Sequence, residues 1–397
     1  MSHDYQECFE KILSHAPGKH FLLDCGGDQA SMSIFVYKEF LKYLGVERLP
    51  QINSLVQLSA MPDKEFLEKY DIGFRWLYPK GSARVRKRAA CIADYTAEYY
   101  LEKGYVSGGS DVAFYDDWGV KWSRSAYYYE QVEHPLQGKS YDDVVAYDFP
   151  DPNDPLKTEN LDQELAAFRK ENKDYVVALS QSYGGLLETA LWIRGYTDFY
   201  VDLASDSKEC AFLLDAILEH FIAFNRNYLS AVKGDVQILA IGDDYGMQDR
   251  LLISPEAWRK HIKPRLQQLI SSVKDQYSHI KIFLHSCGAV SELIDDFIEV
   301  GVDILNPIQP KASGMDPVVL KKKYGDRIVF HGGIDVQELL PCGSPQQVKD
   351  EVWRRLDILA ENGGYIIAPS HNIQAGTPVE NVIAFYNAVL EYSEKIR

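Results

Sequence analysis

The stretch IKIFLHSCGAVSELIDDFIEVGVDILNPI (280–308) shows most clearly which fold class to expect. It opens with a near-continuous apolar run (280–286), continues through an amphipathic segment and closes with a second run of this kind (302–308). Continuous apolar runs of this length are typical of parallel strands that are buried on both faces. A strand, a helix and a parallel strand in this order form a right-handed βαβ unit. The stretch therefore predicts an α/β protein.

The same pattern recurs on both sides of this stretch. Further apolar runs occupy 175–180, 236–244, 327–333 and 364–370, and a first strand is expected near 20–27. Amphipathic segments separate these runs, as expected of repeated βαβ units. An open doubly wound sheet would also fit this order. We favour a (β/α)8 TIM barrel, because the sequence has no GxGxxG after a first strand and because polar residues follow strand after strand.

These polar residues stand at the carboxyl ends of the predicted strands. In a (β/α)8 barrel all such ends meet at one mouth, where barrel enzymes have their active sites. The sequence therefore predicts one site to which several strands contribute. Its candidate members are Asp243, Asp244, His285, Cys287, Asn306, Gln309, His331 and His371.

Residues 1–150 differ in composition and periodicity from the rest of the chain. They are rich in Tyr, Trp and Asp and show weak periodicity, and the proline-containing polar stretch YDFPDPNDPLKTEN (147–160) ends them. Such a stretch is typical of a loop or a boundary. We therefore expect an N-terminal extension (1–150) that contributes the first strand and covers the barrel mouth. The barrel proper would occupy 151–397, and the two parts would form one structural unit.

Two helices carry recognisable start signals. The sequence SPQQ (344–347) predicts a capping box with Ser344 as N-cap, and TPVE (377–380) predicts another with Thr377 as N-cap.

The composition argues against nucleic-acid and membrane partners. The formal net charge is -16 at pH 7, and so acidic a protein repels a phosphate backbone; the basic cluster SARVRKR (82–88) is a short exception. No apolar stretch approaches the roughly 20 residues that span a bilayer, and the acidic N-terminus does not resemble a signal peptide. The six cysteines are scattered without paired spacing, as in reduced cytosolic proteins. We expect a cytoplasmic enzyme.

His285 and Cys287 form the clearest candidate for metal chemistry. They stand two positions apart at the end of a predicted strand, so both side chains project to the same side. Zinc takes about four ligands from Cys, His and carboxylates, and a catalytic zinc keeps one position open. A third protein ligand must therefore come from another strand end. The candidates for it are His371, His331, Asp243, Asp244 and Cys342.

Five segments of the C-terminal half carry the motifs of a known family. They are YGGLLETALWIRGYTDFYVDLASD (183–206), FLHSCG (283–288), VDILNP (302–307), FHGGID (330–335) and APSHNIQAGTPVENV (368–382). In these segments the chain resembles the uroporphyrinogen decarboxylase superfamily, which includes the zinc-dependent methylcobamide:coenzyme M methyltransferases. The last segment, a turn that ends in TPxEN, is the most specific. The resemblance implies a (β/α)8-barrel enzyme.

The resemblance also implies a set of zinc ligands. The methyltransferase branch binds zinc through an H-x-C-G motif and a later cysteine just before an I-x-x-x-T-P stretch. His285 and Cys287 match the motif, and the later cysteine corresponds to His371 in this sequence. Histidine is itself a zinc ligand, so we expect zinc on His285, Cys287 and His371. The decarboxylase branch, which uses no metal, also carries a histidine at the matching position.

The methyltransferase branch moves a methyl group between a corrinoid and a thiol or related acceptor. The corrinoid usually sits on a separate protein, and this chain has no D-x-H-x-x-G corrinoid-binding motif. The resemblance therefore implies a corrinoid protein as partner, beside a small-molecule methyl donor or acceptor. If the small molecule is instead an alcohol or a phenol ether, the methyl group could move in the reverse direction. We expect Asp244 and His331 to act in catalysis. Substrate contacts are expected from Asp243, Tyr183, Asn306 and Gln309.

Two other functions stay open at this stage. A metal-free decarboxylase of the uroporphyrinogen type would use His371 and Asp244 in acid–base or orienting roles. The arginine-rich N-terminal signature of that branch is missing, since the first arginine here is Arg48. The second alternative is a non-catalytic barrel that binds a corrinoid or a corrinoid protein. Stoichiometric zinc would favour the methyltransferase over both.

Overall fold

A computed structural model describes residues 4–84, 97–103, 113–180 and 183–396. Within these residues, eight parallel strands form one sheet with the order β1-β13-β12-β11-β10-β9-β8-β4. The strands are β1 (Leu22–Leu23), β4 (Phe74–Leu77), β8 (Val176–Leu179), β9 (Ile238–Gly242), β10 (Lys281–His285), β11 (Ile304–Ile308), β12 (Val329–Ile334) and β13 (Tyr365–Pro369). Residues 85–88 of the basic cluster and the cysteine at 91 lie outside the described residues.

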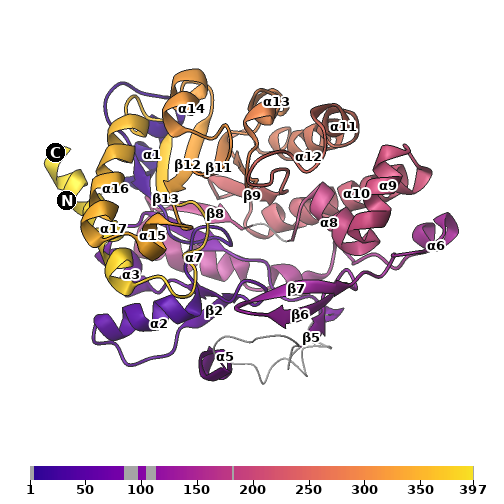
Figure 1. Ribbon diagram of the computed structural model, residues 1–397, viewed down its shortest axis with the longest axis horizontal. Coiled ribbons are helices and arrows are strands. Elements are labelled where there is room, and N and C mark those ends of the chain that lie inside the picture. Colours follow the sequence, from indigo (N-terminus) through magenta and orange to yellow (C-terminus); the bar gives the residue numbers. More distant parts are fainter. Residues whose placement is uncertain (1–3, 85–96, 104–112, 181–182, 397) are drawn as a thin grey trace.

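The sheet confirms the predicted barrel. Each of the six apolar runs between 175 and 370 contains one observed strand, and β1 lies inside the stretch 20–27. The two end strands, β1 and β4, are linked by side chains, because Trp76 Nε1 donates a hydrogen bond to Asp24 Oδ1 at 3.0 Å. The result is a nearly closed (β/α)8 barrel with helices on its outer face (Figure 1).

Strand β4 is the one strand of the barrel that the sequence did not predict. Its sequence, FRWL, places Arg75 in a strand whose residues are all buried. The guanidinium lies 3.7 Å from the ring centroid of Tyr175 and donates to the carbonyl groups of Ile72 and Phe74. These contacts compensate for the burial of the charge. A charged residue in a short run hides the apolar signal on which strand prediction depends.

The helices of the first half are α1 (Tyr5–Leu13), α2 (Ile34–Tyr43), α3 (Lys64–Lys69), α5 (Ala97–Lys103), α6 (Tyr141–Val145), η1 (Pro155–Thr158) and α7 (Leu161–Glu171). Those that follow are α8 (Leu186–Arg194), α9 (Tyr196–Ala204), α10 (Lys208–Ala231), α11 (Pro255–His261), α12 (Lys263–Lys274), η2 (Ser291–Leu293), α13 (Ile294–Val300), α14 (Pro317–Tyr324), α15 (Leu339–Cys342), α16 (Pro345–Leu359) and α17 (Val379–Ile396). None of the described helices combines the length and the hydropathy that crossing a bilayer requires.

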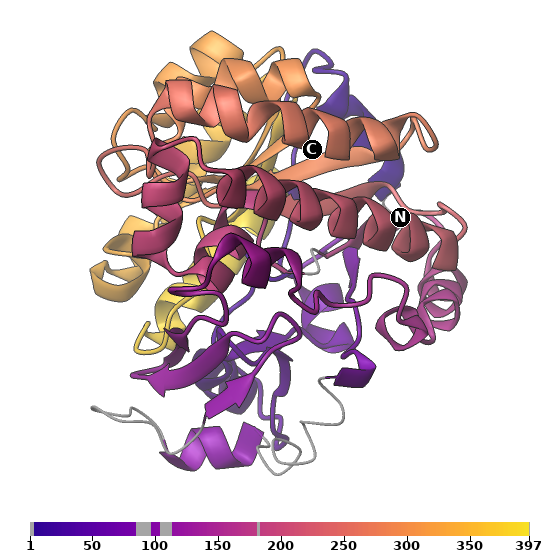
Figure 2. The ribbon, with the colours of Figure 1, turned by 90° about the vertical axis from the view of Figure 1, so that its right-hand side faces the viewer.

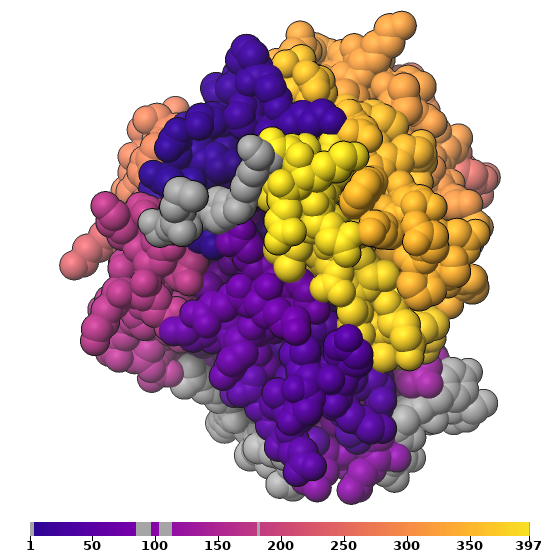
Figure 3. All heavy atoms as spheres, turned by 90° about the vertical axis from the view of Figure 1, so that its left-hand side faces the viewer, coloured from indigo at the N-terminus to yellow at the C-terminus, as the bar shows by residue number. Residues whose placement is uncertain are grey.

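The N-terminal segment and helix α17 lie on the same face of the molecule, as the indigo and yellow surfaces of Figure 3 show. Lys19 Nζ donates to the hydroxyl of Tyr392 at 2.7 Å, and the ring of Phe21 packs edge-on against that of Tyr392. The first strand is therefore held in the barrel by the last helix.

One of the two predicted capping boxes is present. Ser344 and Gln347 exchange the expected hydrogen bonds at the start of α16. The box at Thr377 was wrong: α17 begins at Val379, and the buried Thr377 hydroxyl has no hydrogen-bond partner among the described residues. The carbonyl of Pro378 accepts the first turn's N–H groups instead.

Two small antiparallel sheets belong to the extension. They consist of β2 (Gln51–Ser54) with β3 (Ser59–Met61), and of β5 (Ala113–Tyr115), β6 (Lys121–Ser125) and β7 (Tyr128–Glu133). Figures 1 and 2 show them as a purple layer beside the barrel. Asn372, which follows β13 at the mouth, donates to the side chain of Gln57 in the β2–β3 turn. Since β1 and β4 also come from residues 1–150, the barrel draws on both parts of the chain; the division at 150 stays a prediction.

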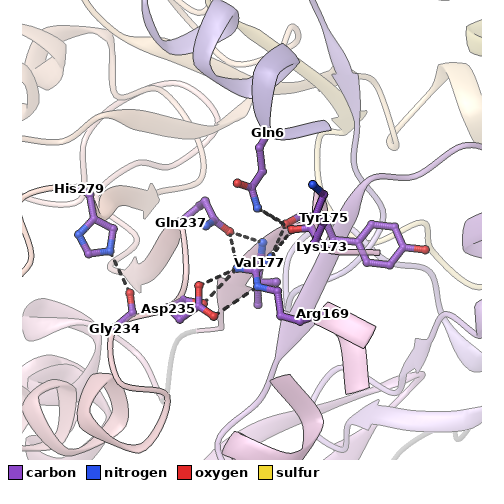
Figure 4. Close-up of polar contacts among 9 residues, drawn as sticks. All are labelled: Gln6, Arg169, Lys173, Tyr175, Val177, Gly234, Asp235, Gln237 and His279. Atoms are coloured by element: carbon purple, nitrogen blue, oxygen red, sulfur yellow. Dashed lines mark hydrogen bonds and ion pairs between the residues drawn. The ribbon is translucent and has the colours of Figure 1, made fainter. Parts of the chain in front are cut away.

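A polar cluster surrounds Arg169 of α7 beside the starts of β8 and β9, at the end of the barrel opposite the mouth (Figure 4). The Arg169 guanidinium donates to the carbonyl of Tyr175 at 2.8 Å and forms an ion pair with Asp235. The side-chain oxygen of Gln237 accepts the N–H of Val177 at 2.8 Å. These contacts join the entries of β8 and β9. Polar groups at this end of a barrel serve stability, while the mouth carries the chemistry.

The extension packs onto the barrel helices through Trp118 and His220. Trp118 is buried, and its ring centroid lies 4.7 Å from that of His220 on α10. The Nδ1–H of His220 donates to the carbonyl of Pro150 at 3.1 Å. Burial and the charge of Lys157 together lower the pKa of His220 to about 3. The imidazole is therefore neutral in the folded protein.

This buried histidine should make the fold sensitive to mild acid. The unfolded chain binds a proton at His220 near pH 6.5 whereas the folded chain does not, so stability should fall as the pH decreases below about 6.5, by up to about 1.4 kcal/mol per pH unit. In His220→Asn, which keeps a donor for Pro150, urea unfolding should lose this part of the pH dependence between pH 7 and 5. His279→Asn, at an exposed histidine, is the control. Equal pH profiles for the wild type and His220→Asn would contradict the prediction.

Candidate metal centre

His285, Cys287 and His371 come together at the barrel mouth. Each offers one ligand atom, and these atoms lie within 4.8 Å of one another. Cys287 Sγ is 3.4 Å from His285 Nε2, and the two imidazole centroids are 5.8 Å apart. His285 ends β10 and His371 follows β13, two strands that β11 and β12 separate. Within the part of the chain that the structure describes, this is the one group of three or more such side chains close enough to hold a metal ion.

A tight turn places Cys287. Gly288 has a φ of 84°, and a Cβ there would lie 2.4 Å from the carbonyl oxygen of Met247. The Cys287 N–H donates to Asp244 Oδ1, and the Gly288 N–H donates to Gln309 Oε1, both at 2.7 Å. Asp244 and Gln309, predicted to contact substrate or to act in catalysis, thus hold the turn that carries the thiol.

A buried chain of hydrogen bonds orients His285. Its Nδ1 lies 2.5 Å from Asn306 Oδ1, and Asn306 Nδ2 lies 2.7 Å from His331 Nδ1. His331 Nε2 is 3.0 Å from Asp24 Oδ2. A carboxylate only accepts, so His331 carries its proton on Nε2, and its Nδ1 accepts from the Asn306 amide. The amide oxygen then accepts from His285 Nδ1–H, and Nε2 of His285 keeps a lone pair for a metal.

The surroundings of the thiol are acidic. Glu188 in the first turn of α8 is partly buried, and desolvation together with the charges of Asp244 and Asp243 raises its pKa well above the ordinary value. Burial and the charges of Asp244 and Glu188 likewise raise the pKa of Cys287. Burial and the neighbouring His285 together lower the pKa of His371 to about 4. A neutral imidazole is the form that binds metals, and a cation at this place would offset the negative charges.

Three predicted site residues make their polar contacts within the protein. Asn306 is fully buried between the two imidazoles. Asp243 is also fully buried and accepts the N–H groups of Leu187 and Glu188, so it caps α8. His331 is fully buried as well. Their predicted contacts with substrate or reacting groups stay predictions.

Tyr183 differs from these three residues, because it lines a cavity. It stacks on Trp118 at 5.8 Å between ring centroids. Cys342, another candidate ligand, is exposed in α15 and lies outside the group.

Sequence reasoning missed two residues of this neighbourhood, Asp24 and Glu188. Asp24 follows the short strand β1, and Glu188 lies in the first turn after the glycine pair that ends the β8 loop. An acidic residue directly after a strand is a usable signal for the barrel mouth, and Asp24 in HFLLDCGG satisfies it. Glu188 lies within a helix, and only the folded chain brings it to Asp244.

Three comparisons place this geometry among known proteins. The profile of the family described as Uroporphyrinogen decarboxylase (URO-D) matches residues 131–392. Methylcobamide:CoM methyltransferase MtaA of Methanosarcina barkeri is 30% identical over 179 residues, which are 45% of this chain and 48% of that protein. A uroporphyrinogen decarboxylase of Hordeum vulgare is 24% identical over 277 residues, or 65% of this chain and 80% of that protein. The chain spans about half the length of the MtaA relatives that it matches.

A solved methyltransferase from Methanosarcina mazei has the same architecture. It superposes with a TM-score of 0.62 over 98% of this chain and 99% of that chain, at 18% sequence identity. At that identity the likeness concerns the fold, and it confirms the barrel.

Proposed function

Because this chain belongs to the uroporphyrinogen decarboxylase (URO-D) family, we propose that it is a zinc-dependent methyltransferase of that family. It moves a methyl group between a corrinoid, carried by a partner protein, and a thiol or related acceptor. The observation that carries this proposal is the meeting of His285, Cys287 and His371 at the barrel mouth. The similarity to a methylcobamide:CoM methyltransferase supports it.

The donor set fits zinc. Two imidazole nitrogens and one sulfur are ligands that zinc prefers, and three protein ligands leave one position for a substrate. The hydrogen bond from His285 Nδ1 to Asn306 leaves Nε2 available on the side of Cys287. When bound, zinc would lower the pKa of a coordinated substrate thiol and so make it a nucleophile at neutral pH.

The chain's own residues would hold this centre in place. Asn306 keeps His285 in one tautomer, and outer hydrogen bonds of this kind orient metal ligands. Asp244 fixes the backbone of Cys287. The carboxyl groups of Asp244 and Glu188 would stabilise a bound cation through their charge. In this proposal Asp244 and His331 position the ligands rather than exchange protons with substrate.

The corrinoid protein is part of the proposal. The barrel mouth, where parallel strands end, is the place at which barrel enzymes receive their cofactors and substrates, and the chain carries no D-x-H-x-x-G motif of its own. A cytoplasmic location and the absence of a nucleic-acid partner stay predictions.

Zinc content and methyl transfer test the proposal together. Elemental analysis should find close to one zinc per chain. The zinc-loaded protein should transfer the methyl group of methylcobalamin to small thiols, and a chelator should stop this transfer until zinc is restored. A protein that neither contains nor takes up zinc would contradict the proposal.

A metal-free decarboxylase is the second candidate, and the match to a plant uroporphyrinogen decarboxylase over 80% of its length favours it. His371 and Asp244 would then orient a carboxylated substrate. Release of carbon dioxide from uroporphyrinogen by zinc-free protein would support this candidate. Tight binding of a corrinoid protein without either reaction would indicate the non-catalytic alternative.

A further inference from the structure

A cavity of about 260 Å³ lies between the extension and the barrel mouth. Four aromatic side chains contribute to its wall: Trp122 of β6, Trp192 of α8, Tyr183 and Tyr78. The rings of Trp122 and Trp192 are 5.4 Å apart at 79°, and those of Tyr183 and Trp192 are 5.0 Å apart at 85°. Rings that stand nearly perpendicular to one another form the walls of a cage.

A buried carboxylate supports two of these rings from behind. Asp116 accepts the indole N–H of Trp122 at 2.7 Å and the hydroxyl of Tyr183. A negative charge at the polar edge of a ring increases the electron density on its faces. Aromatic faces attract cations, most strongly where water is excluded. The wall therefore favours a cationic ligand.

The cavity also contains a carboxylate of its own, Asp28. Its oxygens accept from the hydroxyl of Ser180 at 2.7 Å and from the amide of Asn53 at 3.4 Å, and both donors are neutral. Burial raises the pKa of Asp28 to about 6. None of the described residues that line the cavity is a lysine or an arginine. An ammonium group would thus meet a carboxylate and aromatic faces at once.

Contacts join this cavity to the metal centre on two sides. Asn372, the neighbour of His371, donates to the carbonyl of Asp28 at 2.7 Å. Gly184 lines the cavity, and a Cβ there would lie 3.1 Å from Cβ of Glu188, whose carboxyl group interacts with Asp244. The cavity and the metal centre are therefore neighbours in the fold.

We infer that this cavity binds an ammonium group of the methyl acceptor, and that the acceptor is a small aminothiol. The inference rests on the proposed function, because the thiol end is assigned to the metal centre. Asp28 and the electron-rich rings select the far end of the molecule by its charge. A thiol with a sulfonate or carboxylate at that end would be repelled by Asp28.

Three thiols of equal chain length test this selection: 2-aminoethanethiol, 2-mercaptoethanol and 2-mercaptoethanesulfonate. Calorimetric titration of the zinc-loaded protein should show the aminothiol binding at least about tenfold more tightly than the neutral thiol, with the sulfonate weakest. Propylammonium and 1-propanol provide the same comparison in zinc-free protein, since neither needs a metal. If the protein takes up no zinc but binds propylammonium more tightly than 1-propanol, the proposed function and the aminothiol acceptor are both contradicted. Only the ammonium site is then supported.

Two variants assign the preference to the cavity. Asp28→Asn keeps the size of the side chain and removes its charge, and should reduce the preference for ammonium about tenfold. Trp192→Leu removes one ring and should reduce it about threefold to tenfold. Asp275→Asn, at an exposed residue after α12, should change nothing. Equal affinity for the three thiols, a preference for the sulfonate, or a preference that survives both cavity variants would overturn the inference.

Discussion

Replacing Cys287 by alanine should reduce zinc affinity and methyl transfer more than any other single change. The thiolate is the one sulfur ligand of the proposed set, and its loss leaves two imidazoles from two distant strands. Loss of an outer hydrogen-bond partner of a metal ligand already costs about 10- to 100-fold in affinity, so loss of a direct ligand should cost more than about 100-fold. Zinc titration with a competing chelator measures the affinity, and transfer from methylcobalamin measures the activity.

The matched control is Cys342→Ala. Cys342 is exposed in α15 and lies outside the ligand group, so its removal should leave zinc content and activity unchanged. Thermal unfolding of the zinc-free proteins should show that Cys287→Ala keeps its fold, because the side chains of Asp244 and Gln309 hold the N–H groups of this turn. Full zinc occupancy in Cys287→Ala would refute the assignment of the ligand.

Asn306→Leu should weaken both the metal centre and the barrel. The leucine can neither accept from His285 Nδ1–H nor donate to His331 Nδ1. A buried polar group that loses its hydrogen-bond partner lowers the stability of the fold by about 1–3 kcal/mol. In this variant each of two imidazoles loses one partner. Freed from its acceptor, His285 is no longer held in the tautomer that presents Nε2, and zinc affinity should fall about 10- to 100-fold. Urea unfolding and zinc titration measure the two effects.

Two further variants separate the effect on the orientation of His285 from the effect on the stability of the fold. Asn306→Asp keeps an oxygen acceptor for His285, so its zinc affinity should exceed that of Asn306→Leu. Asn381→Leu removes another fully buried amide, which donates to the carbonyls of Leu340 and Gly343 away from the site. It should lower stability and leave zinc affinity unchanged. If Asn306→Leu bound zinc as tightly as Asn381→Leu does, Asn306 would have no role in orienting His285.

The strands of the barrel were predictable because their signal is local. A run such as 280–286 is mostly apolar, as burial on both faces requires of a parallel strand. The same argument failed at β4, where Arg75 interrupts a short run and is accommodated by the ring of Tyr175 and by two carbonyl groups. The ring of Tyr175 comes from a distant part of the chain, outside any window that periodicity examines.

The roles of the polar residues were less predictable than their location. Asp243 and Asn306 do stand at the mouth end of their strands, as expected, but both are fully buried and satisfied by protein groups. A sequence shows that a carboxylate or amide follows a strand and does not show whether it faces the solvent. Burial of a polar side chain depends on which hydrogen-bond partners other segments supply.

Local pattern alone was enough to predict parallel βαβ units and a His285–Cys287 pair on one side of a strand, because pleat and hydrophobic period are properties of neighbouring residues. The meeting of this pair with His371, the hydrogen-bond chain through Asn306 to Asp24, and the cage beside Asp28 arise only when the sheet curls toward closure. The reason is physical. Contacts across a barrel mouth depend on the order and curvature of all the strands, and no stretch of the chain carries that information by itself.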